Sequence, residues 1–108
     1  MKEQITSEQK KMYETIIEEA TTDCYSDYEQ ISGWACLLDD TIRTPCSCAL
    51  GKEKAILEKI DTDNSGNVVI GVIKLNKTKL RGLIEDVILD NQKAMDYINA
   101  YAYWCKEC

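Results

Sequence analysis

IDTDNSGNVVIGVI, residues 60–73, decides between two fold classes for this chain. Four of its residues match the first half of an EF-hand calcium loop, whose flanking segments are helices: Asp61, Asp63, Ser65 and Gly66. The twelfth loop position should be a Glu that gives both carboxylate oxygens to the ion, but it is Val72. The stretch therefore lacks the ligand that completes an EF-hand site.

The residues on both sides of this turn favour strands. Residues 68–73 read VVIGVI, a β-branched run that packs well on a pleated sheet. The incoming residues 54–60 alternate, which places Ile56, Glu58 and Ile60 on one face of a strand. The Asp, Asn, Ser and Gly residues of the turn bond their own backbone and accept positive φ. We therefore predict a β-hairpin with the turn DTDNSGN in place of an EF-hand.

Further β-rich runs surround the hairpin, and together they cover residues 46–84. The expected strands read CSCAL, KAILEKI, VVIGVIKL and KLRGLIE, and turns rich in Gly, Asn and Lys separate them. Runs of this length predict a small antiparallel sheet or half-barrel of roughly three to five strands.

Segments with helical periodicity precede the strands. Residues 7–20 carry one apolar stripe behind a capping box formed by Thr6 and Gln9. Residues 25–42 carry a second apolar stripe, with residues recurring at intervals of three and four. This second helix must end before Pro45, because the residue preceding a proline avoids the helical region.

A third helical segment follows the strands at residues 90–104. The order is two N-terminal helices, an antiparallel sheet and a C-terminal helix, so we predict an α+β fold in which residues 1–108 form a single domain. Aromatic side chains at helical spacing are expected in the core: Trp34, Tyr97, Tyr101, Tyr103 and Trp104.

The composition argues against several classes of protein. Apolar residues make up 44% of the chain and charged residues 30%, a balance that argues against disorder. The chain has no apolar run of roughly eighteen residues, and the stretch MKEQITSEQKK has no apolar signal core, so we expect a cytoplasmic protein without a membrane partner. With no His, no nucleophile elbow and no phosphate-cradling glycine loop, the sequence also argues against an enzyme.

The acidic residues are concentrated in the first part of the chain. The formal net charge is −6, and residues 1–40 contain ten acids against three lysines. Such a field repels nucleic acid and attracts cations or a basic protein partner. The distribution therefore indicates an acidic interaction or inhibitor protein that acts by surface charge, or simply an acidic surface that keeps a small protein dissolved.

Six cysteines and no histidine leave two interpretations open. Without a secretory signal, reduced thiols are expected in place of disulfides. Cys46 and Cys48 form a CxC pair, while Cys105 and Cys108 form a CxxC pair. If the fold joined the two pairs, four thiolates would hold a structural Zn²⁺ in tetrahedral geometry. The alternative is a set of buried or inert thiols.

Asp39 and Asp40 are the principal metal-ligand candidates because they lie at the end of the second predicted helix. A helix C-terminus already carries partial negative charge from its unsatisfied carbonyls. Two more negative charges are therefore unfavourable there, and a bound cation would reverse the sign of the interaction. Carboxylates beside free carbonyls suit Ca²⁺, which takes about six to eight oxygen ligands.

Two aspartates do not fill such a coordination shell. Asp23, Asp27 and Glu29 from the preceding turn are expected to contribute, together with backbone carbonyls and water. The alternative interpretation of the Asp-Asp pair is a solvated surface feature with Arg43 as its local partner.

Several short motifs together resemble those of a known family. The motifs are Asp23-x-Tyr25, Gly33-Trp34, Leu38-Asp39-Asp40, Pro45 and a terminal Tyr103-Trp104. In this order and spacing, over residues 20–104, they resemble the small cyanobacterial-type calcium-binding proteins that lack EF-hands, the CcbP-like proteins. The chain departs from the family pattern at Asn99 and Ala100, where the family tends to have an acidic pair.

The resemblance implies helices packed beside a small curled sheet, and calcium binding or buffering through acidic side chains. Together with the helix-end argument it favours a calcium buffer or sensor, with Asp39 and Asp40 as the main ligands. The acidic interaction protein and the structural zinc protein are the alternatives.

Overall fold

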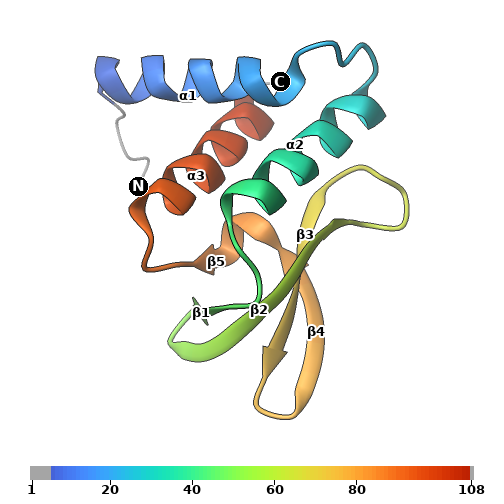
Figure 1. Ribbon diagram of the computed structural model, residues 1–108, viewed down its shortest axis with the longest axis vertical. Coiled ribbons are helices and arrows are strands. Elements are labelled where there is room, and N and C mark those ends of the chain that lie inside the picture. Colours follow the sequence, from blue (N-terminus) through green and yellow to red (C-terminus); the bar gives the residue numbers. More distant parts are fainter. Residues whose placement is uncertain (1–5, 108) are drawn as a thin grey trace.

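The computed structural model describes residues 6–107, which form three helices and a five-stranded antiparallel sheet (Figure 1). The helices are α1 (Ser7–Thr21), α2 (Asp27–Thr41) and α3 (Gln92–Glu107), and a short 3-10 turn, η1, covers Ile84–Asp86. The strands are β1 (Cys46–Leu50), β2 (Glu53–Thr62), β3 (Val69–Leu75), β4 (Thr78–Leu83) and β5 (Val87–Ile88). The predicted α+β class and the helix–helix–sheet–helix order are confirmed.

The strands follow the spatial order β4-β3-β2-β1-β5, and every neighbouring pair is antiparallel. The strand β5 lies beyond the predicted range 46–84. In the chain it lies between η1 and α3. Its two residues pair with Ala49 and Leu50 at the edge of the sheet. A strand this short carries no periodicity of its own, so the pairing depends on tertiary contacts that bring it beside β1.

The apolar face of β2 differs from the predicted one. Ala55, Leu57 and Ile60 are the buried residues, whereas Ile56 is 44% exposed on the opposite face. The pairing of β2 with β3 shifts register after Leu57, between Leu57 and Lys59. A bulge of this kind adds one residue to a strand, which returns Ile60 to the core side after the alternation has been interrupted.

Local hydrogen bonds set the starts of two helices. α2 begins at Asp27, later than predicted, because the Ser26 hydroxyl caps it by accepting a hydrogen bond from the N–H of Glu29 (3.1 Å). The start of α3 follows Asn91, whose side-chain oxygen accepts from the N–H of Ala94 (3.1 Å). None of the helices within residues 6–107 is long and apolar enough to cross a membrane.

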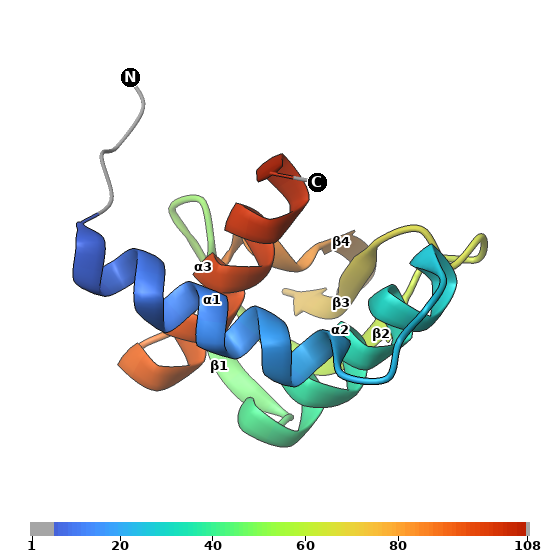
Figure 2. The same ribbon diagram turned by 90° about the horizontal axis from the view of Figure 1, so that it is seen from above.

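The helices form two layers above the sheet (Figures 1 and 2). α2 packs on β2 and β3, and α3 packs on α2 and η1. α1 lies across α2 and α3, away from the sheet, and begins behind the predicted capping box of Thr6 and Gln9. The buried side chains of α1 are Tyr13, Ile16 and Ala20, which recur at helical spacing.

Gly33 permits the close contact between α1 and α2. A Cβ atom at this position would collide with the carbonyl oxygen of Ala20 and would lie 3.2 Å from the Sγ of Cys24. The next residue, Trp34, is fully buried in the middle of α2. The Gly33-Trp34 motif therefore serves packing, with the glycine beside the end of α1 and the indole in the core.

An aromatic cluster joins α2 to α3. The ring centroid of Trp34 lies 5.4 Å from that of Tyr101 and 5.8 Å from that of Trp104. The Tyr101 hydroxyl accepts a hydrogen bond from the N–H of Val69 (3.0 Å), which ties α3 to the first residue of β3. Trp34 and Tyr101 are fully buried as predicted, whereas three of the expected core aromatics are only half-buried: Tyr97, Tyr103 and Trp104.

Candidate functional site

Asp39 and Asp40 lie in the last turn of α2, and both side chains are exposed. That turn contains no basic residue. The last hydrogen bond of the helix runs from the N–H of Ile42 to the carbonyl oxygen of Leu38 (2.7 Å). The backbone carbonyls that follow Leu38 therefore have no partner within the helix. Two carboxylates thus stand beside the partial negative charge of a helix C-terminus.

Among the described residues, no basic side chain forms an ion pair with Asp39 or Asp40. Within residues 6–107 the ion pairs shorter than 4.0 Å are Lys59–Asp61 (3.4 Å) and Lys79–Glu58 (3.3 Å). Arg43 is exposed and forms no ion pair with either Asp39 or Asp40 in this part of the chain. The alternative in which Arg43 balances the acidic pair is therefore not realised in the structure.

The other three predicted ligands lie at the opposite end of α2. Asp27 and Glu29 occupy its first turn, where the helix N-terminus carries partial positive charge and acidic side chains are stabilising. Asp23 lies in the connection from α1, with a φ of 60°, a left-handed conformation that Asp tolerates in turns. All three side chains are exposed.

The length of α2 separates these two acidic groups. At the usual rise per residue, Asp27 and Asp39 lie about 18 Å apart along the helix axis, whereas calcium ligands lie about 2.3–2.6 Å from the ion. One ion therefore cannot take ligands from both ends of α2. This corrects the expectation that the acidic residues of both ends coordinate the same ion. Within residues 6–107, no group of three or more His, Cys, Asp or Glu is placed to hold a metal. An ion at the C-terminal end needs backbone carbonyls and water to complete its shell.

The EF-hand-like stretch forms the turn between β2 and β3, as predicted. The carboxylate of Asp63 accepts hydrogen bonds from the N–H groups of Asn67 (2.7 Å) and Val68 (3.2 Å) and from the hydroxyl of Ser65 (2.9 Å). These hydrogen bonds, led by that of Asn67, lower the pKa of Asp63. Asp63 thus closes the hairpin with its own carboxylate oxygens.

The four-cysteine zinc site is not supported. Cys46 and Cys48 lie on β1, which follows the C-terminal end of α2, whereas Cys105 lines a pocket with Asp27 at the N-terminal end. The two positions lie at opposite ends of a helix about 22 Å long, and Cys108 lies outside the described residues. Burial raises the pKa of the Cys46 and Cys48 thiols, which disfavours the thiolate that binds metal.

Two solved structures share this arrangement of helices and strands. The first is a "calcium binding protein in the calcium-binding form", with a TM-score of 0.76, 17% sequence identity, and coverage of 95% of this chain and 97% of the other. The second is Anabaena CcbP, with a TM-score of 0.72, 16% identity, and coverage of 95% and 93%. The chain has their fold. No family model and no curated protein matches it in sequence.

The CcbP-like resemblance suggested by the sequence motifs is thus confirmed for the fold. The motif residues divide into two kinds in this structure. Gly33, Trp34 and Leu38 are packing residues. The side chains of Asp39 and Asp40 are exposed on the same helix and are not part of the hydrophobic core. Asp39 and Asp40 therefore stay candidate ligands, as does the exposed Asp23 at the other end of α2.

Proposed function

We propose that this chain binds calcium through Asp39 and Asp40 at the C-terminal end of α2. The observation that carries the proposal is an acidic pair at the negative end of a helix, to which no basic side chain of residues 6–107 is paired. Such an arrangement is unfavourable without a counter-ion, because the carboxylates repel one another and the helix-end carbonyls. A divalent cation turns this repulsion into attraction.

The oxygen-only surroundings favour a hard cation. In this proposal Asp39 and Asp40 supply carboxylate oxygens, the end of α2 supplies backbone carbonyls, and water completes a shell of about six to eight ligands. Asp23, Asp27 and Glu29 belong to a separate acidic group at the other end of α2 and are not part of this shell. The fold adds support, because one structure that shares it is a "calcium binding protein in the calcium-binding form".

A buffer and a sensor differ in what the rest of the surface does. A calcium buffer needs only the ion site, whereas a sensor also needs a surface that recognises a partner. We propose that the ion site acts outside any EF-hand loop, because the one EF-hand-like stretch is a hairpin turn whose Asp63 carboxylate is already hydrogen-bonded.

Calorimetric titration of the metal-free protein with calcium tests the proposal. The wild type should show saturable heat, and Asp39→Asn with Asp40→Asn should abolish it. Asp27→Asn with Glu29→Gln is the matched control, since it removes the same charge from the same helix and should leave the titration unchanged. Absence of heat at millimolar calcium in the wild type would end the proposal, and so would normal binding by the Asp39 and Asp40 variant.

A further inference from the structure

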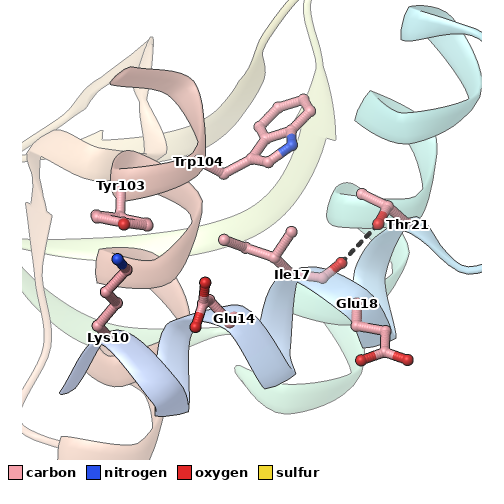
Figure 3. Close-up of a pocket in the computed structure, with 7 residues that line it drawn as sticks. All are labelled: Lys10, Glu14, Ile17, Glu18, Thr21, Tyr103 and Trp104. Atoms are coloured by element: carbon pink, nitrogen blue, oxygen red, sulfur yellow. Dashed lines mark hydrogen bonds between the residues drawn. The ribbon is translucent and has the colours of Figure 1, made fainter. Parts of the chain in front are cut away.

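An open groove of about 590 Å³ runs between α1 and α3 (Figure 3). α1 contributes Glu14, Ile17 and Glu18, with the two carboxylates one turn apart, and α3 contributes Tyr103 and Trp104. Figure 3 shows Ile17 directed toward α3, so the floor of the groove is apolar, while its α1 side carries Glu14 and Glu18 together with Lys10.

A second cavity of about 420 Å³ lies at the N-terminal end of α2. It is bounded by the first turns of α2, the turn between β2 and β3, and the end of α3. Asp27 provides a carboxylate there, and Ile31 and Val68 provide apolar surface. Trp104, which is half-buried, lines this cavity as well as the groove and is the residue that the two share.

Acidic side chains outnumber basic ones along this double cavity, since Glu14, Glu18 and Asp27 line it together with Lys10. Residues 12–42 contain eight acids and no Lys, Arg or His. Lys10 lies at one end of the groove, one helical turn from Glu14, but the residues one turn away from Glu18 are Glu14 and Thr22. The N-terminus of α2 offsets only about half a charge near Asp27. Within residues 6–107, neither Glu18 nor Asp27 forms an ion pair with a basic side chain.

Two exposed tyrosines flank the start of α2, and the ring of one of them, Tyr28, reaches a residue that lines the second cavity. Tyr25 is 86% exposed and Tyr28 is 66% exposed, the two largest values among the bulky apolar side chains of residues 6–107. The ring of Tyr28 lies over Gly66 of the β2–β3 turn, where an added Cβ would be 2.6 Å from the ring. Aromatic faces attract Lys and Arg side chains, so these rings add to the preference for cations that the carboxylates create.

We propose that the double cavity, from Glu18 across Trp104 to Asp27, docks a basic segment of a partner protein that also carries an aliphatic side chain. Lysine or arginine side chains of this segment pair with Glu18 and Asp27, and the aliphatic side chain contacts Trp104 and Ile31. The negative walls repel acidic peptides and phosphate backbones. Two copies of this chain joined through the same face would oppose carboxylate to carboxylate.

The test uses a short synthetic peptide rich in lysine, arginine and leucine, without aromatic residues, titrated into the protein in EDTA. Calcium binding therefore plays no part in the result. Trp34 is fully buried, so a change in tryptophan emission on peptide addition reports on Trp104. A counterpart peptide with glutamate in place of the basic residues should produce no change, and Trp104→Phe should abolish the emission change with the basic peptide.

Two charge variants separate docking in the cavity from general attraction to an acidic protein. Glu18→Gln with Asp27→Asn should weaken peptide binding about tenfold at about 50 mM salt, where screening is modest. Asp39→Asn with Asp40→Asn removes the same charge outside the cavity and should change the affinity less than about twofold. Equal weakening by both variants, or no binding of the basic peptide by the wild type, would overturn the proposal.

Discussion

The two ends of α2 carry similar acidic groups in opposite electrostatic settings. Asp27 and Glu29 occupy the first turn, where the helix N-terminus and the Ser26 cap stabilise negative charge. Asp39 and Asp40 occupy the last turn, where the helix-end carbonyls repel negative charge and no basic residue lies nearby in that turn.

The position of a carboxylate on a helix therefore matters more than the number of carboxylates. Acids at the N-terminal end are stabilised in part by the helix dipole and remain available for weak, exchangeable contacts with a basic partner. Acids at the C-terminal end are unfavourable without a cation. One helix thereby presents two acidic ends with different preferred partners, and four experiments test this contrast.

Replacement of Trp34 by Ala has the largest expected effect, because it removes the anchor in the middle of α2 that holds both ends in place. The indole is fully buried against Tyr101 and Trp104. Loss of a buried aromatic of this size lowers the free energy of unfolding by about 3–5 kcal/mol. Urea denaturation measures the loss, and a decrease below about 1 kcal/mol would show that α2 is anchored elsewhere.

Calcium should stabilise the protein through the C-terminal end alone. A ligand present at about one hundred times its dissociation constant raises the free energy of unfolding by about 2.7 kcal/mol. Thermal unfolding with and without calcium should show this increase in the wild type and in Asp27→Asn with Glu29→Gln. The increase should be absent in Asp39→Asn with Asp40→Asn. An increase of equal size in all three proteins would remove the contrast between the two ends.

Without calcium, neutralising the two ends should shift stability in opposite directions. In EDTA, Asp39→Asn with Asp40→Asn should raise the free energy of unfolding, because each charge opposes the helix dipole by about 0.3–1 kcal/mol. Asp27→Asn with Glu29→Gln should lower it by a similar amount. Chemical denaturation at low ionic strength gives the largest signal, since salt screens the dipole interaction. Shifts of the same sign at both ends would contradict the electrostatic account.

The smallest expected effect concerns the turn that borders the N-terminal end of α2. The pKa of Asp63 is lowered in the folded state, so its carboxylate stabilises the fold fully at pH values above the ordinary pKa of an aspartate. This stabilisation is lost as the pH falls through the lowered pKa of the folded state. Asp63→Ala should therefore lower the melting temperature slightly at neutral pH. The difference from the wild type should vanish in strong acid, and a difference that grows on acidification would be inconsistent with the hydrogen bonds described.

Much of the fold was predictable because local chemistry and tertiary packing agree. The DTDNSGN turn closes through Asp63, and the capping box of Thr6 and Gln9 and the apolar stripe of α2 recur in the structure. The bulge after Leu57 and the short strand β5 were not predictable. Both features depend on how neighbouring strands pair. The alternation of apolar and polar residues within one segment predicts neither an inserted residue nor a pairing strand of two residues.

The candidate site was predictable only in part. Asp39 and Asp40 could be singled out because the helix end gives their charges a physical meaning. Their grouping with Asp23, Asp27 and Glu29 in one ion site was wrong. The predicted helix 25–42, with the usual rise per residue, already places the two acidic groups too far apart along the helix axis. The groove beside Trp104 could not be foreseen, because α1 and α3 meet there from opposite ends of the chain. Its one sequence signal was the absence of basic residues over positions 12–42.

The most direct test of the central claim is a calcium titration followed by backbone amide NMR. The account predicts saturable shifts at the C-terminal end of α2, around Leu38 to Arg43, and no comparable shifts around Asp23 to Glu29. Saturable shifts at the N-terminal end alone, or no calcium-dependent shifts at either end, would contradict the claim that calcium binds where α2 stops.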